Sequence, residues 1–407
     1  MIRSILLTIT VTIPLLLVGC VSMALPKVSA RLDEAPARPV LASRALTRES
    51  WEASRDELRR QFADEVYGPW PEHGPARIVS HEVIDTAAFD GAGTIEQYAL
   101  SLAGRDTHLV TVRPNGAAGP LPVVVLQMFC GNRAVFDGRE EIAGPVTPYA
   151  PSCGGGWEGM TVKMIFGRHI MSPPIARILE HGYALAFIYP GDIVPDTSRA
   201  APDALAQLMP EADGEAGAIA AWAWVYSQAI GVLERYDRER MAVWGHSRNG
   251  KSALLAAAFD QRIDLVIAHQ AGTGGTTLTR SYAGESVAQI TNAYSYWFSP
   301  AYAAYAGHED AIPVDQHQLI ALMAPRPLLI GGAWRDQWSD PEGSFRAAEG
   351  ANPVYALYGS EGLRQAGLDD FDPDADIALF MRRGLHGVTA VDWGRFLEFL
   401  DAHFAAD

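Results

Sequence analysis

A serine between a predicted strand and a predicted helix is the clearest candidate for chemistry in this sequence. Ser247 lies in the segment Gly245–Gly250 (GHSRNG), after the apolar run 240–244 and before the Ala- and Leu-rich run 249–259. A tight turn from strand to helix holds a serine hydroxyl clear of the backbone, and glycines on either side relieve the crowding of that turn. The second glycine comes one residue later than in the usual G-x-S-x-G pattern, so the generic motif is met only in part. This context predicts that Ser247 is a nucleophile.

A nucleophilic serine needs a base, and His386 is the histidine best placed to serve. It lies in the segment 383–387 (RGLHG), which precedes the predicted closing helix. In α/β-hydrolases the acid and then the histidine follow the serine along the chain. His246 and His269, which lie near the predicted turn, are expected to shape the site instead.

The acid that orients this histidine is expected after the strand-like run 327–332. Asp336 and Asp340 both follow that run, where the carboxyl edge of a parallel sheet would present them. Asp340 precedes a proline at the start of a predicted helix, an arrangement typical of a helix cap. We therefore predict that Asp336 is the catalytic acid and that Asp340 caps the helix, with Asp340 as the alternative acid.

The elements that would position these residues alternate along the chain. The predicted strands span 77–84, 94–102, 108–113, 121–129, 183–189, 240–244, 263–268, 327–332 and 354–358. The predicted helices span 51–67, 173–181, 215–236, 249–259, 343–350 and 392–404. Strands that alternate with helices predict a mostly parallel central sheet with helices on both faces, which with the elbow indicates the α/β class and the α/β-hydrolase fold. We expect a single catalytic domain over residues 46–407.

The segment that begins at Gly245 (GHSRNGKSALLAAAFDQRIDLVIAHQAGTGG) resembles the glucuronoyl esterases, carbohydrate esterase family 15. Those enzymes carry G-C-S-R-N-G-K-G or G-H-S-R-x-G-K at the nucleophile, a pattern that includes the late glycine. The similarity continues in order through 284–285, 296–299, 313–317, 324–327, 336–341 and His386, and is dense over about residues 215–400. The family hydrolyses esters between 4-O-methyl-glucuronic acid on xylan and lignin alcohols. The resemblance thus implies a serine carboxylic-ester hydrolase that needs no metal or organic cofactor.

The resemblance also implies roles for individual residues. Ser247 would be the nucleophile and His386 the base, while Arg248 would hold the oxyanion through its backbone N–H and its guanidinium. Three further residues match positions that bind the uronate sugar, namely Lys251, Glu285 and Trp338. The structural alternatives are a salt bridge to a nearby acid for Arg248, an exposed loop position for Glu285 and rim packing for Trp338.

One departure from the family concerns the acid. Fungal members place a glutamate after the strand that follows the elbow, in Gln-Glu-Ser-Gly, whereas this chain has Gln270 there. An amide cannot stabilise an imidazolium as a carboxylate does. Several bacterial members supply an aspartate at the position of Asp336 instead, and this supports Asp336 as the acid.

The first residues read as an export signal. Arg3 precedes an apolar run, 5–18, that is too short for a comfortable membrane span. The run ends in Leu17–Cys20 (LVGC), which matches a lipoprotein lipobox. We predict a lipoprotein signal over 1–19, lipidation of Cys20 and a tether over 20–45. An ordinary secretory signal is the alternative, and both signals would export the protein. The lipid anchor would hold it in the bacterial cell envelope, in the periplasm or on the outer membrane.

The composition restricts the possible partners. The formal net charge is −16, and removal of the leader would make it more negative by one. Such an acidic chain is not expected to bind nucleic acid or an anionic membrane surface. The expected partner is a glucuronoxylan or lignin–carbohydrate ester, with membrane contact only through the lipid.

Two cysteines, Cys130 and Cys153, remain after the predicted lipidation site. In an exported protein they are expected to form a disulfide, although two free thiols are the alternative. Their spacing fits no zinc site. The segment between them matches no family hallmark and is expected to reshape the substrate cleft.

Two other functions stay open. An acetylxylan or other acyl esterase would keep the chemistry and change the substrate. A non-catalytic glycan-binding lipoprotein would keep only the fold, and Gln270 is the feature that favours it.

Overall fold

One nine-stranded sheet organises the chain. The computed structural model describes residues 46–136, 138–144, 150–233, 236–281 and 283–404, so the predicted leader, Cys20 and the tether lie outside the described residues. The strand order is β1-β2-β3-β5-β4-β6-β7-β8-β9. The strands from β5 through β9 pair in parallel, while β1, β2 and β3 form an antiparallel extension.

The strands are β1 (Arg77–Ala88), β2 (Gly93–Leu102), β3 (Arg105–Pro114), β4 (Val123–Gln127), β5 (Ala184–Ile188), β6 (Met241–His246), β7 (Leu265–His269), β8 (Leu328–Ala333) and β9 (Ile377–Arg382). The helices are α2 (Arg48–Phe62), α3 (Asn132–Val135), α4 (Ala150–Cys153), α5 (Trp157–Phe166), α6 (Ile175–Glu180), α7 (Ala201–Leu208), α8 (Ala218–Val232), α9 (Arg248–Phe259), α10 (Val287–Ala293), α11 (Pro300–Ala304), α12 (Gln316–Ala321), α13 (Pro341–Ala356) and α14 (Ala390–Phe404).

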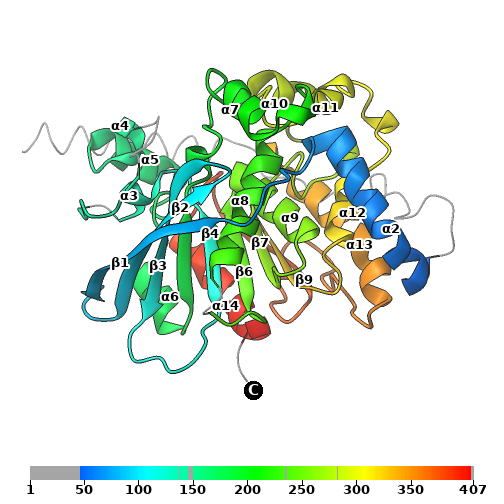
Figure 1. The fold of residues 1–407 in the computed structure, drawn as a ribbon. Helices are drawn as coiled ribbons and strands as arrows, with labels where there is room; N and C mark the ends of the chain where they lie inside the picture. Colours follow the sequence, from blue (N-terminus) through cyan, green and yellow to red (C-terminus); the bar gives the residue numbers. More distant parts are fainter. Residues whose placement is uncertain (1–45, 137, 145–149, 234–235, 282, 405–407) are drawn as a thin grey trace, which may run out of the picture.

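Each face of the sheet is covered by its own hydrophobic core. In β4 the side chains alternate, so that Val123 and Val125 join one core while Val124 and Leu126 join the other. Helices α2, α8, α9, α12 and α13 contribute to the first core, and α6 and α14 to the second. Because both faces are covered, the central strands are buried and largely apolar. Figure 1 shows α8 and α9 crossing in front of the sheet and α14 on the other side of it.

This arrangement is the α/β-hydrolase fold, and the predicted fold class is confirmed. The parallel strands share one carboxyl edge, where β6 leads to the predicted elbow, β8 to Asp336 and β9 to His386. The sheet therefore brings together three segments that are far apart in the sequence.

One predicted strand is wrong. Residues 354–358 were expected to pair, but α13 continues through Ala356, and the last strand is β9. Val354 and Tyr355 are fully buried on the helix, and the Tyr355 hydroxyl donates to the carbonyl of Arg326 at 2.9 Å. Tertiary packing thus overrides the strand propensity of this short run.

Within the described ranges, none of the helices combines the length and apolar character that crossing a membrane requires.

Candidate active site

The turn between β6 and α9 holds Ser247 in a strained conformation. Its φ and ψ are 59° and −121°, and its backbone N–H donates to the carbonyl of His269 at 2.8 Å. A Cβ on Gly245 would lie 1.9 Å from the carbonyl oxygen of Asn249, so only glycine fits there. A Cβ on Gly250 would lie 3.1 Å from the carbonyl oxygens of Gly245 and His269. The late glycine therefore serves the close packing of the elbow one residue further into the helix.

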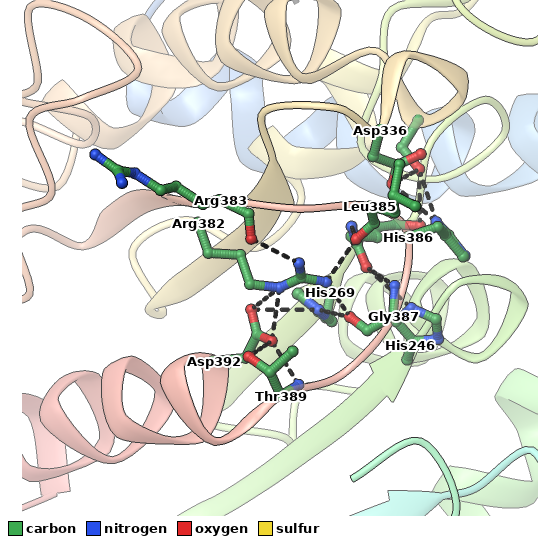
Figure 2. Close-up of polar contacts among 12 residues, drawn as sticks. His246, His269, Asp336, Arg382, Arg383, Leu385, His386, Gly387, Thr389 and Asp392 are labelled. Atoms are coloured by element: carbon green, nitrogen blue, oxygen red, sulfur yellow. Dashed lines mark hydrogen bonds and ion pairs between the residues drawn. The ribbon is translucent and has the colours of Figure 1, made fainter. Parts of the chain in front are cut away.

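His386 and Asp336 form the hydrogen-bonded pair expected of a catalytic base and its acid. His386 Nδ1 lies 2.8 Å from Asp336 Oδ2 (Figure 2). The Ser339 hydroxyl donates to the same oxygen at 2.7 Å. Asp336 is buried, whereas 30% of the His386 side chain is exposed. His386 and Ser247 line one cavity. The contact with Asp336 leaves Nε2 of His386 as the nitrogen that can accept a proton from substrate or serine.

The environment keeps Asp336 ionised. Burial by itself would raise the pKa of this carboxyl, but the charge and hydrogen bond of His386, with the hydrogen bonds of Ser339, hold the pKa below its usual value. Asp340 instead caps α13, since its side chain accepts from the Gly343 N–H at 3.0 Å and from the Ser281 hydroxyl. The geometry thus pairs His386 with Asp336 and assigns Asp340 to the helix.

Two further histidines pack beside His386. The ring of His246 lies 4.6 Å from that of His386 and 5.2 Å from that of His269, measured between centroids. Burial holds the pKa of His246 well below its ordinary value and lowers the pKa of His269 to about 4. Both rings are therefore neutral at pH 7 and are placed to shape the site.

Gln270, at the position of the fungal glutamate, contacts the histidine loop. Its Oε1 accepts from the backbone N–H of Gly387 at 2.8 Å and lies 3.1 Å from His246 Nε2. Its Nε2 donates to the carbonyl of Leu385 at 3.4 Å. The amide thus supports the backbone on both sides of His386.

Arg248 begins α9 directly after the serine, and a neighbouring acid holds its guanidinium in place. The guanidinium forms an ion pair with Asp196, which also accepts from the Tyr296 hydroxyl at 2.6 Å and the Trp297 indole at 3.0 Å. The guanidinium carbon also lies 4.8 Å from the centre of the Trp297 ring, within the range of a cation–π contact. The salt bridge considered from the sequence therefore exists, and it holds a cation next to the nucleophile.

The three residues expected to bind sugar lie together on one side of the elbow. Lys251 is buried, and its Nζ donates to the carbonyls of Ala271 at 2.5 Å and Thr273 at 2.6 Å. Burial lowers the pKa of Lys251 to about 8, against the opposing charge of Glu285. The side chains of Glu285 and Trp338 are hydrogen-bonded, and Trp338 is 53% exposed.

A second region next to the elbow is mainly apolar and includes none of these three residues. A cavity of about 290 Å³ adjoins Ser247 and His386. Its lining also includes Gln127, Phe129, Ser152, Val162, Phe166, Ile170, Trp244, His246, Arg248 and Asn249. Val162 and Phe166 come from α5, whose residues Trp157 and Met160 are largely exposed. The site thus has a polar region and an apolar region.

The disulfide expected from the sequence is present. Cys130 and Cys153 are joined, and both are buried in the core that covers the α14 face of the sheet. The bond ties the end of α4 to the loop after β4, so it anchors the segment that leads into α5. Over the described ranges, no group of three or more His, Cys, Asp or Glu side chains is arranged to hold a metal ion.

Sequence reasoning missed Asp196 and Ser339, which hold Arg248 and Asp336. Ser339 lies three residues after Asp336, so their hydrogen bond could have been predicted from the local sequence. Asp196 lies in the segment after β5, more than 50 residues from Arg248 along the chain. No local pattern marks it.

Comparison with known proteins shows which proteins this chain is similar to. A family model described as glucuronyl esterase, fungi, matches residues 196–359. A carbohydrate esterase from an unknown prokaryotic organism is 34% identical over 364 residues, which cover 86% of this chain and 84% of the relative. The 4-O-methyl-glucuronoyl methylesterase 1 of Wolfiporia cocos is 35% identical over 36% of this chain and 39% of its own length.

Solved structures extend the similarity to the whole described fold. A structure reported as a promiscuous esterase of carbohydrate esterase family 15 from a marine bacterial metagenome has a TM-score of 0.78 and 30% identity, over 94% of this chain and 99% of the other. The glucuronoyl esterase of Solibacter usitatus has a TM-score of 0.77 and 28% identity, over 94% and 100% of the two chains.

Proposed function

This chain belongs to the glucuronoyl esterases of carbohydrate esterase family 15, which are carboxylic ester hydrolases, and we propose that it cleaves uronate esters of plant cell-wall glycans through an acyl-enzyme on Ser247. The observation that carries the proposal is the pairing of His386 with the buried carboxylate of Asp336 beside the strained serine. The substrate follows from relatives named as 4-O-methyl-glucuronoyl methylesterases and glucuronoyl esterases.

The proposed reaction uses Ser247, His386, Asp336 and Arg248, with water as the second nucleophile. His386 Nε2 takes the proton of Ser247 as the hydroxyl attacks the ester carbonyl, and Asp336 stabilises the imidazolium that forms. The tetrahedral oxygen would lie at the start of α9, where the backbone N–H and the cation of Arg248 stabilise its charge. His386 then gives the proton to the leaving alcohol, and the same pair activates the water that hydrolyses the acyl-enzyme.

The polar and apolar regions beside the elbow predict how the ester is oriented in the site. Lys251 and Glu285 can hydrogen-bond sugar hydroxyls, and Trp338 offers an exposed indole, so the uronoyl group would occupy the polar side. The alcohol would then face the cavity lined by Val162 and Phe166. Burial of apolar surface in that cavity favours an apolar alcohol over a hydrophilic one.

Hydrolysis of benzyl glucuronate, compared with nitrophenyl acetate, tests the proposal. We expect a much higher kcat/KM for the uronate ester and complete loss of both activities in Ser247→Ala. A higher kcat/KM for the acetate ester would indicate an acetylxylan or other acyl esterase. Full activity of Ser247→Ala would refute serine catalysis, and binding of glucuronoxylan without hydrolysis would indicate the glycan-binding lipoprotein.

We also propose that the enzyme is exported and lipid-anchored through Cys20. The lipobox-like segment 17–20 supports this proposal. Expression in a bacterium with labelled fatty acid is expected to label the wild-type protein and not Cys20→Ser. Equal labelling, or none in either protein, would contradict the anchor.

A further inference from the structure

The backbone of the loop that carries His386 is hydrogen-bonded to one guanidinium. Arg382, the last residue of β9, donates from Nη1 to the carbonyl of Arg383 at 3.1 Å. Its Nη2 donates to the carbonyls of Leu385 and Gly387, both at 2.7 Å. Figure 2 shows these carbonyls converging on Arg382 from the loop that curves around it. Three carbonyls within five residues, on both sides of His386, therefore share one side chain.

Asp392 fixes the guanidinium itself. Both carboxylate oxygens accept from Arg382 Nε at 2.8 Å, and one of them also accepts from the backbone N–H and the hydroxyl of Thr389, each at 2.7 Å. Arg382 and Asp392 are both buried, and Asp392 lies in the first turn of α14. The planar guanidinium can make all these contacts at once because its donors form a rigid fork, which a lysine ammonium lacks.

Gly387 is held from two further directions. His269 Nε2 lies 3.0 Å from its carbonyl oxygen, and Gln270 accepts from its N–H at 2.8 Å. A Cβ at Gly387 would lie 2.1 Å from the carbonyl oxygen of Phe166, so the residue must be glycine. With Gly384 on the other side of the histidine, this loop has little stiffness of its own.

We propose that Arg382 is a positioning residue, which keeps the His386 imidazole between Asp336 and Ser247 by fixing the backbone of loop 383–387. The proposal rests on the proposed function, because it takes His386 to be the base. The imidazole is partly exposed, and Asp336 and Ser339 are the described side chains that hydrogen-bond it. The position of its backbone therefore decides where the ring lies. A displacement of about 1 Å in a reacting group can cost about 100-fold in rate.

The chain offers a matched control in Arg326, which precedes β8 and so lies at the amino ends of the parallel strands. Its guanidinium also donates to backbone carbonyls, at 2.6 Å to Ile263 and 2.7 Å to Ala257. It contacts none of the residues of the site. Replacement of its guanidinium by a lysine ammonium should therefore disturb the fold to a comparable extent without moving His386.

The test compares Arg382→Lys with Arg326→Lys on benzyl glucuronate and on nitrophenyl acetate. For Arg382→Lys we expect kcat to fall about 10- to 100-fold on both esters, with KM within about 2-fold of the wild type because the sugar contacts are untouched. For Arg326→Lys we expect a kcat within about 2-fold of wild type at a temperature where both variants are folded. An equal loss of kcat in the two variants, or a loss expressed in KM, would overturn the proposal.

A thermodynamic cycle with His386→Ala separates positioning from general damage. If Arg382 acts through His386, then Arg382→Lys should lower the residual rate of the His386→Ala enzyme less than about 2-fold. A merely structural role would lower that residual rate by the same factor as in the wild type, and this would overturn the proposal.

A second variant covers the case in which Arg382→Lys does not fold. Arg382→Met combined with Asp392→Leu removes both charges of the buried pair, an exchange that often leaves stability unchanged. It should show the same loss of kcat. Failure of the proposed function would appear separately, as hydrolysis that survives Ser247→Ala.

Discussion

Replacement of Asp336 by asparagine is expected to slow the enzyme more than any other isosteric change in the site. The carboxylate lies 2.8 Å from His386 Nδ1 and is buried. For a full charge pair at that distance, an effective dielectric constant of about 20 gives an interaction of about 6 kcal/mol. The imidazolium forms during acylation, so this stabilisation is lost mainly from the transition state. At about 1.4 kcal/mol for each tenfold change, kcat should fall about 10⁴-fold.

Asp340→Asn is the matched control for this prediction. Asparagine is as good a helix cap as aspartate, so α13 should keep its start and kcat should stay within about 3-fold of the wild type. Both variants would be assayed on benzyl glucuronate under initial-rate conditions, after thermal melts show that they are folded. A loss below about 10-fold in Asp336→Asn, or an equal loss in Asp340→Asn, would refute the assignment of the acid.

Three further predictions concern the two sides of the site. Because burial lowers the pKa of Lys251 to about 8, the ammonium becomes a neutral amine as the pH rises through that value. KM for a uronate ester should therefore rise between about pH 7 and 9, and in Lys251→Met it should be higher and independent of pH over that range; a parallel rise in the variant would contradict this. Phe166→Ala should lower kcat/KM about 5-fold for benzyl glucuronate, because the benzyl group then buries less apolar surface, and less than about 2-fold for the methyl ester; equal decreases on the two esters would exclude the cavity as the alcohol site. Replacement of Cys130 and Cys153 by serine should lower the free energy of unfolding in urea by about 3 kcal/mol, because the unfolded chain gains conformational entropy without the cross-link. An unchanged midpoint and slope of the urea transition would contradict this prediction.

The elements nearest the serine could be predicted because their signals are local. The turn from β6 to α9 is determined by a buried strand, two glycines and a helix-forming run that are adjacent in the sequence. The choice between Asp336 and Asp340 also rested on a local feature, the proline that follows the cap. The resemblance to a known family then supplied the sugar-binding candidates, whose positions the structure brings to one side of the elbow.

The contacts that hold these groups could not be predicted in the same way. Asp196 reaches Arg248 from the segment after β5, and Asp392 reaches Arg382 from α14. Which buried acid pairs with which arginine depends on the register of the sheet and on how the helices pack over it. The wrong strand at 354–358 has the same origin, because packing of Val354 and Tyr355 decided the conformation of a run that suited either state.

The amide at Gln270 is compatible with a catalytic acid, Asp336, that follows the neighbouring strand β8. Ser339 donates to Asp336 and lies 3.4 Å from the carbonyl of Gln270, so the ends of β7 and β8 meet beside the histidine loop. A carboxylate at residue 270 would introduce a second buried negative charge there, and like charges raise each other's pKa. Asp336 could then lose the ionised state in which it stabilises the imidazolium. Glutamine avoids this conflict and still accepts from the N–H of Gly387. The position that holds the acid in fungal members thus serves here to support the loop that carries the base.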